Sequence, residues 1–235
     1  ALGSYAEWIG VTSAGLKIRD EGVERYCAAL ERAEPGTVRF VDFSRQIKEH
    51  WRALQTSDFD RIFRHFGSGQ HQQHVHVVDL HRQNHIEGTL QPLSTLRRLR
   101  VLCLAYCTRL TGTLDPLAGM VQLEHLDVTA CDKLEGPLDC LVHCVKIQRL
   151  ILDDCAKLKS TLDVLSKFPN LNLFHCNTQN KMLLTGTLAP LLNLSKLTDL
   201  QLQECRRLTG SLEAKQGGFA KLTNLVRLDL SRTEL

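Results

Sequence analysis

One phrase recurs through about the last two thirds of this 235-residue chain. LRVLCLAYCTRLTGTLDPL begins at Leu99, and LEHLDVTACDKLEGPLDCL follows at Leu123, 24 residues later. IQRLILDDCAKLKSTLDVL begins another 24 residues on. The same step back reaches Val75, and further steps of 24, 26 and 28 residues reach the remaining starts at Leu171, Leu197 and Leu225. A period of roughly 20–29 residues with leucines at fixed places predicts a stacked solenoid, in which each turn buries its apolar face against the next.

The repeats align into columns that predict one short strand per turn. Apolar residues occupy the first, fourth and sixth positions of each copy, as in Leu99, Leu102 and Leu104. Side chains of a strand alternate between its two faces, so the intervening positions point outward. Stacked in register, these strands predict a parallel sheet whose inner side chains fill the core.

Two further columns carry cysteine and glycine. The cysteine column predicts a ladder of side chains inside the bend, where they meet turning backbone groups; it contains Cys107, Cys131, Cys155 and Cys205. The glycine column predicts a backbone conformation or a close approach that a Cβ would hinder; it contains Gly88, Gly112, Gly136, Gly186 and Gly210. Pro92, Pro116 and Pro190 recur on the back of the turn, where a missing N–H is harmless.

The LxxLxL wording resembles the leucine-rich-repeat family over about two thirds of the chain. LTGTL resembles the plant-type repeat, and the cysteine column resembles the cysteine-containing type. The segment IRDEGVERYCAALERAEPGTVRFVDF, residues 18–43, is similar to ribonuclease-inhibitor-like repeats. The resemblance implies an α/β fold, a right-handed solenoid with a concave parallel β-sheet.

Residues 1–74 predict a helical N-terminal cap with early irregular repeats, and residues 75–235 a solenoid of about seven turns. An apolar stripe from Val23 to Leu30 predicts one helix, which Pro35 and Gly36 end. Ser57 and Gly67 bracket a second helix as N-cap and stop. Its apolar face would cover the open end of the stack; it consists of Phe59, Ile62, Phe63 and Phe66.

Composition and charge narrow the function classes. The chain is 43% hydrophobic but only 6% aromatic, which suits a thin core filled by leucine. Its net charge of +3 is too balanced to predict a specific nucleic-acid partner, which requires a concentrated basic face. The sequence has no apolar run of about 18 residues, so it predicts no membrane span.

Nine cysteines, an odd number without paired spacing, argue against a secreted disulfide framework. We therefore expect an intracellular, reducing compartment, either the cytosol or an organelle interior. The chain begins at Ala1 without Met, so any targeting segment ahead of it is invisible here. It ends at Leu235 just after a strand-like stretch, and we expect either that the natural protein continues or that another chain covers this end.

The sequence predicts neither an enzyme nor a cofactor or metal site. Gly-rich phosphate loops, HExxH and GxSxG are all absent. Five histidines crowd one stretch, but strand alternation separates them, and carboxylates or cysteines at ligand spacing are missing; they are His71, His74, His76, His81 and His85. Cys140 and Cys144 either pair, bind zinc with Cys131, or simply pack in a back-side turn, which we favour.

A basic cluster also has two interpretations. Arg97, Arg98 and Arg100 either contact phosphate or form a solvated loop that leads into a strand. We favour the loop, because three charges without interleaved aromatic residues make a weak nucleic-acid footprint.

The outward strand positions form the concave face, which is the candidate partner-binding surface. Its predicted contact residues are Val77, Asp79, Val101, Tyr106, His125, Asp127, Arg149, Ile151, Asp153 and His175. Exposed apolar residues rimmed by Asp and Arg are typical of a protein interface, although a sheet face also carries β-branched residues without binding anything. We expect Tyr106, Val101 and Ile151 as apolar anchors, with Asp127, Arg149 and Asp153 setting the register of a partner.

The sequence thus predicts a non-enzymatic protein–protein interaction scaffold whose partner is a protein of unknown identity. One alternative is an architectural or accessory subunit of a large organellar complex, either a membrane supercomplex or a ribonucleoprotein. Another is a recognition fragment of a larger receptor or ubiquitin-ligase adaptor, which the family resemblance allows.

Overall fold

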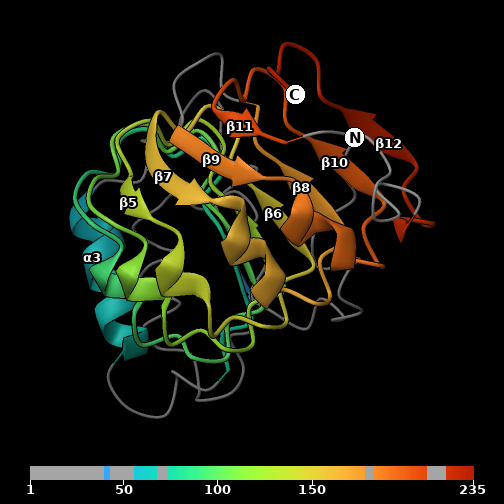
Figure 1. The fold of residues 1–235 in the computed structure, drawn as a ribbon. Coiled ribbons are helices and arrows are strands. Elements are labelled where there is room, and N and C mark those ends of the chain that lie inside the picture. Colours follow the sequence, from blue (N-terminus) through green and yellow to red (C-terminus); the bar gives the residue numbers. More distant parts are fainter. Residues whose placement is uncertain (1–39, 43–55, 68–73, 178–182, 211–220) are drawn as a thin grey trace.

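The computed structural model describes residues 40–42, 56–67, 74–177, 183–210 and 221–235. The helix predicted between Val23 and Leu30 lies outside these residues. The described part is a solenoid of short strands and 3-10 helices, with one α-helix beside the first turns (Figure 1).

The main sheet contains eight parallel strands, one per turn. In spatial order they are β1 (Phe40–Asp42), β2 (Val77–Asp79), β3 (Val101–Cys103), β4 (His125–Asp127), β6 (Arg149–Ile151), β8 (Leu173–His175), β10 (Asp199–Gln201) and β12 (Arg227–Asp229). The observed register pairs Leu102 with Leu126 and Leu126 with Leu150, as the repeat columns predict. The predicted strands and their register are therefore confirmed.

A second parallel sheet runs along the other side of the solenoid. It contains β5 (Glu135–Pro137), β7 (Lys157–Thr161), β9 (Leu183–Thr187) and β11 (Leu208–Thr209), which lie side by side in that order in Figure 1. Isolated bridges at Gly88 and Gly112 continue the same pattern into the earlier turns. The sequence reading did not predict this sheet, because its strands carry the Leu-x-Gly-x-Leu motif rather than a strand-like alternation.

The glycine column belongs to this second sheet. Gly136 has a φ of +91°, and a Cβ at this position would lie 3.1 Å from Cγ2 of Thr113 in the preceding turn. Both the left-handed conformation and the close approach favour glycine. The predicted reason for the column is confirmed at this position.

Short 3-10 helices complete the turns between the two sheets. They are η2 (Gln91–Leu93), η3 (Asp115–Leu117), η4 (Asp139–Leu141), η5 (Leu162–Lys167) and η6 (Ala189–Asn193). Proline is the second residue of η2, η3 and η6, where its missing N–H interrupts no sheet ladder.

The helix α3 (Thr56–Gly67) lies at the opposite end of the stack from β12 (Figure 1). Phe59, Ile62 and Phe63 are buried and join the core of the solenoid. The helix begins at Thr56, one residue before the predicted N-cap Ser57, so Ser57 lies inside its first turn.

The cysteine ladder links successive turns by sulfur hydrogen bonds. The Sγ of Cys131 donates to the carbonyl oxygen of Leu104 at 3.1 Å, and the Sγ of Cys155 donates to that of Val128 at 3.0 Å. Burial raises the pKa of these thiols, so they stay protonated and keep their donor. The predicted structural role of the column is therefore confirmed.

Of the described cysteines, Cys107, Cys131, Cys140, Cys144, Cys155 and Cys205 are free thiols. Cys144 is buried in the core and Cys140 is half-buried beside it. Packing, rather than a disulfide, accounts for both residues.

Candidate functional site

The concave face is closed over its first half. The side chains of Val77, Val101 and Cys103 are buried, although the sequence reading expected an exposed apolar cluster here. The Sγ of Cys103 lies 4.0 Å from Oδ2 of Asp127 on the next strand. The repeat pattern gave the direction of these side chains correctly but not their depth, and the prediction that Val77 and Val101 are exposed contacts is wrong.

His125 is also buried, in the middle of this closed half. Burial lowers the pKa of its imidazole to about 3, and the positive charge of Arg149 contributes. His125 is therefore a neutral, buried side chain at physiological pH. Its predicted place on an accessible contact surface is wrong.

The aspartates of this half are largely buried and hold the turn that follows each strand. Oδ1 of Asp79 accepts a hydrogen bond from the backbone N–H of His81 at 3.0 Å. Oδ1 of Asp127 accepts from the backbone N–H of Thr129 at 2.9 Å and from its hydroxyl at 2.6 Å. Both carboxylates thus satisfy local donors, as Asx turns do. Asp127 is a structural residue, so the expectation that it sits on an exposed rim is wrong.

Tyr106 lies in the turn after β3 rather than on the sheet face. Its φ is +63°, and its side chain is 45% exposed. The ring packs edge-on against His81, with centroids 5.5 Å apart, and the guanidinium of Arg82 lies 5.7 Å from its centroid. Tyr106 therefore borders the concave face at the carboxyl ends of the strands.

The second half of the concave face is more open. Its predicted contact residues Arg149, Ile151, Asp153 and His175 are all half-buried, so each reaches the solvent in part. They come from β6, β8 and the turn after β6, which places them side by side on neighbouring strands. This half-exposed group is called the open concave half below, together with Gln201 of β10.

A buried carboxylate organises one end of the open concave half. Asp199 accepts hydrogen bonds from Arg227 at 2.8 and 2.6 Å, and its Oδ2 lies 3.2 Å from Nε2 of His175. Nε2 of Gln201 donates to its other oxygen at 3.2 Å. Burial opposes ionisation of Asp199, but the hydrogen bonds from His175 and Arg227 outweigh it and lower its pKa. The sequence reading did not select Asp199 or Arg227, because a single column does not show which neighbours pair.

A second polar chain crosses the turns beyond β6, β8 and β10. Oδ1 of Asp153 accepts from the backbone N–H of Asn177 at 2.7 Å, and Oδ1 of Asn177 accepts from that of Gln203 at 3.1 Å. Burial raises the pKa of Asp153, although the Asn177 hydrogen bond opposes the shift. These bonds fix the side chains of Asp153 and Asn177.

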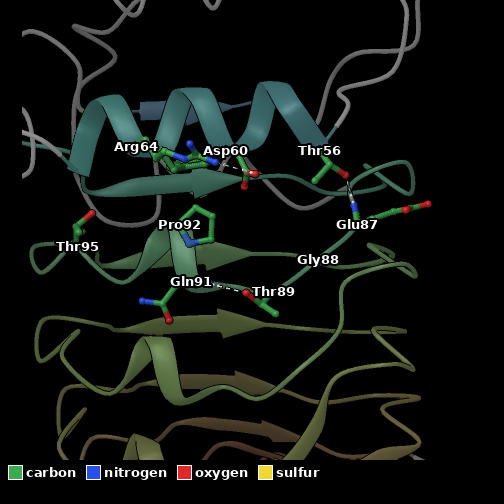
Figure 2. Close-up of a pocket in the computed structure, with 10 residues that line it drawn as sticks. Thr56, Asp60, Arg64, Glu87, Gly88, Thr89, Gln91, Pro92 and Thr95 are labelled. Carbon is green, nitrogen blue, oxygen red and sulfur yellow. Dashed lines mark hydrogen bonds and ion pairs between the residues drawn. The ribbon is translucent and has the colours of Figure 1, made fainter.

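A separate hollow of about 650 Å³ lies between α3 and the first regular turn (Figure 2). Asp60 and Arg64 of α3 face it and pair with each other at 3.4 Å. Across it, the backbone N–H of Glu87 donates to Oγ1 of Thr56 at 2.7 Å, and the Glu87 carboxylate pairs with Arg109. The charged groups that line the hollow are thus paired with each other or with a neighbouring turn. The Thr56 hydrogen bond connects α3 to the first regular repeat.

The described residues hold no group of three or more His, Cys, Asp or Glu side chains placed to bind a metal ion. Within the same residues, every helix is too short or too polar to cross a membrane.

The fold is similar to three solved structures. An internalin (inlF) of Listeria monocytogenes aligns with 85% of this chain and 48% of its own, at a TM-score of 0.54 and 16% identity. The functional domain of InlJ from the same species, which includes a cysteine ladder, aligns over 84% and 43%, at 0.50 and 16%. The Arabidopsis receptor kinase HAESA, solved with the peptide hormone IDA and the co-receptor SERK1, aligns over 84% and 34%, at 0.54 and 14%.

This chain is a leucine-rich-repeat solenoid. No protein-family model matches its sequence, and no curated protein does. The solenoid spans less than half the length of each of the three structures. At these identities the likeness establishes the leucine-rich-repeat fold, with its stacked parallel sheets, and nothing about a particular ligand.

Proposed function

We propose that this leucine-rich-repeat solenoid is a non-enzymatic scaffold that binds a protein partner on its open concave half. The carrying observation is the contrast in exposure along the concave face. The predicted contacts on β2, β3 and β4 are buried, whereas Arg149, Ile151 and His175 on β6 and β8 reach the solvent. A partner approaching from the concave side meets this second half.

The chemistry of the open concave half suits a protein. Ile151 supplies an apolar centre, and Arg149, Asp153 and His175 surround it with groups of both signs. An apolar centre with a polar rim is the usual arrangement of a protein interface. The Asp199 cluster holds His175 and Arg227 in place beforehand, so less side-chain freedom is lost on binding.

A solved structure of similar fold supports the proposal that the ligand is a protein or a peptide. HAESA was solved with a peptide hormone and a co-receptor, which shows that one solenoid of this kind takes polypeptide ligands. For this chain, we extend the proposal to an intracellular, reducing compartment, because its nine cysteines are an odd number without paired spacing. An architectural subunit and a receptor fragment remain alternative predictions.

The test compares two double variants by affinity capture and quantitative mass spectrometry. Ile151→Arg with Gln201→Arg adds two positive charges to the open concave half. Thr161→Arg with Ala189→Arg adds the same charge at exposed positions of β7 and η6. We expect the first variant to lose the partners captured by the wild type and the second to retain them, with both variants folded by circular dichroism.

Retention of every wild-type partner by the concave variant would remove the open concave half as the binding surface. A large stoichiometric set of subunits that both variants keep would favour the architectural alternative.

A further inference from the structure

The loops that lead into the main-sheet strands form a basic edge of the solenoid, called the leading flank below. It consists of residues 94–100, 118–124, 142–148, 166–172, 192–198 and 221–226. These segments contain seven cations, namely Arg97, Arg98, Arg100, Lys146, Lys167, Lys196 and Lys221, and one carboxylate, Glu124. Their net charge is thus +6, against +3 for the whole chain, so the remainder is net negative. The excess of positive over negative charge in this protein therefore lies in these segments.

Six of these cations are exposed and available to a ligand. Arg100 is the exception, because its Nε and Nη2 donate to the two carboxylate oxygens of Glu124, each at 2.9 Å. That pair neutralises the single carboxylate of the flank. The electrostatic potential at the surface of the flank is therefore set by the six cations that have no carboxylate of the flank beside them.

Three of the exposed cations stand in one row. Arg98, Lys146 and Lys196 occupy the same position in alternate turns, and amide side chains fill the turns between them. Nζ of Lys146 donates to Oε1 of Gln122 at 2.5 Å, and Nζ of Lys196 donates to Oδ1 of Asn170 at 2.7 Å. The amides hold the two ammonium groups along the row.

The spacing of the row follows from the sheet. Neighbouring strands lie about 4.8 Å apart, so cations in alternate turns lie on the order of 10 Å apart. A polypeptide in the polyproline II conformation rises roughly 3.1 Å per residue with three residues per turn, so its side chains at every third position lie on one face, roughly 9 Å apart. A chain with an acidic residue at every third position therefore meets successive cations of the row.

Exposed apolar side chains lie beside the row. Val121 is 44% exposed and Val145 is 47% exposed, and each directly precedes a residue of the row. At the start of the row, a hollow of about 390 Å³ is lined by His76, Arg97, Arg98, Arg100, Val121 and Gln122. Apolar side chains exposed next to cations favour a partner that is itself both acidic and apolar.

We propose that the leading flank binds an acidic segment of a polypeptide in the polyproline II conformation, with a carboxylate at about every third residue and apolar residues between. A single-stranded nucleic acid fits less well, because the described part of the flank exposes no Phe, Tyr or Trp side chain for bases to stack on. An anionic membrane fits less well too, because Val121 and Val145 are small compared with the Trp, Phe and Leu that insert into lipid. This site is independent of the open concave half.

The test measures fluorescence anisotropy of two labelled peptides with the intact chain. One peptide contains four Glu-Val-Ser triplets, and the other has the same residues in three blocks. The row variant carries Arg98→Glu, Lys146→Glu and Lys196→Glu. The control variant carries Lys133→Glu, Lys157→Glu and Arg206→Glu, which are exposed on the opposite edge and change the net charge equally.

We expect the triplet peptide to bind more tightly than the block peptide. We also expect the row variant to weaken this binding by about tenfold or more, and the control variant by less than about twofold. The affinity should fall as salt rises to about 0.15 M. Equal weakening in both variants, or equal binding of both peptides, would overturn the proposal.

Two further probes decide the class of partner. Vesicles that contain phosphatidylserine, and a single-stranded oligouridylate, are titrated against the same wild-type chain and row variant. We expect both to bind more weakly than the triplet peptide. Tighter binding of either probe, lost in the row variant, would assign the flank to lipid or nucleic acid instead.

Discussion

Replacing Leu126 by alanine removes a side chain from the middle of the solenoid core. Leu126 is fully buried and pairs in register with Leu102 and Leu150 on the two neighbouring strands. Loss of three carbon groups costs about 2.4 kcal/mol of transfer free energy, at about 0.8 kcal/mol for each group. The turns on both sides prevent collapse of the space, so a cavity term raises the expected loss of stability to about 3–4.5 kcal/mol.

Leu228→Ala is the matched comparison, because Leu228 occupies the same column on β12. It is 47% exposed, since no described strand follows it in the sheet. Only about half of the transfer free energy applies and no closed cavity forms, so we expect a loss of about 1 kcal/mol. Urea unfolding followed by circular dichroism measures both, from the midpoint and the slope. Equal losses for the two variants, or a loss below about 1 kcal/mol for Leu126→Ala, would refute the assigned register.

Three other predictions follow from the same contacts. Iodoacetamide should leave Cys131 unmodified in the folded chain, because burial raises the pKa of its thiol well above the usual value, and should modify it in denaturant. Peptide mass spectrometry locates the label, and rapid labelling of Cys131 in the folded chain would contradict this prediction. Gly136→Ala should lower the free energy of unfolding by about 1–3 kcal/mol, and by more than Gly88→Ala does. Both glycines have a positive φ, but of the two only Gly136 has a neighbouring side chain within contact distance. Equal effects of the two substitutions in urea unfolding would exclude the steric contribution. Asp199→Asn should destabilise the chain above about pH 4, and the difference in unfolding free energy from wild type should shrink as pH falls through the lowered folded pKa of Asp199. Unfolding measured from acid to neutral pH tests this, and a difference that stays constant with pH would contradict the charged cluster.

The sequence predicts the main sheet well because each column has one physical cause. Leu102, Leu126 and Leu150 must be buried, so the apolar period determines both the strand positions and their register. Cys131 is confined by the bend, and the observed sulfur hydrogen bond to Leu104 follows from that place. Local pattern and packing point to the same fold at these residues.

The sequence predicts the interaction surface less well, because alternation gives the direction of a side chain and not its exposure. Val101 and Ile151 both point to the concave side, yet Val101 is buried and Ile151 is half-exposed. The pairing of Asp199 with Arg227 depends on which of several polar neighbours comes within reach. The second sheet escaped prediction because glycines such as Gly136 in β5 and Gly186 in β9 lower strand propensity.

Site-specific photocrosslinking tests the proposed binding surface most directly. A benzophenone side chain is placed at Ile151 in the open concave half, and in a second chain at Ala189 on the outer side of the solenoid. After irradiation in the source cells, mass spectrometry identifies the adducts. We expect a protein adduct at position 151 that Gln201→Arg abolishes, and none of that protein at position 189. The same adduct at both positions, or at 189 alone, would show that the open concave half is not the binding surface.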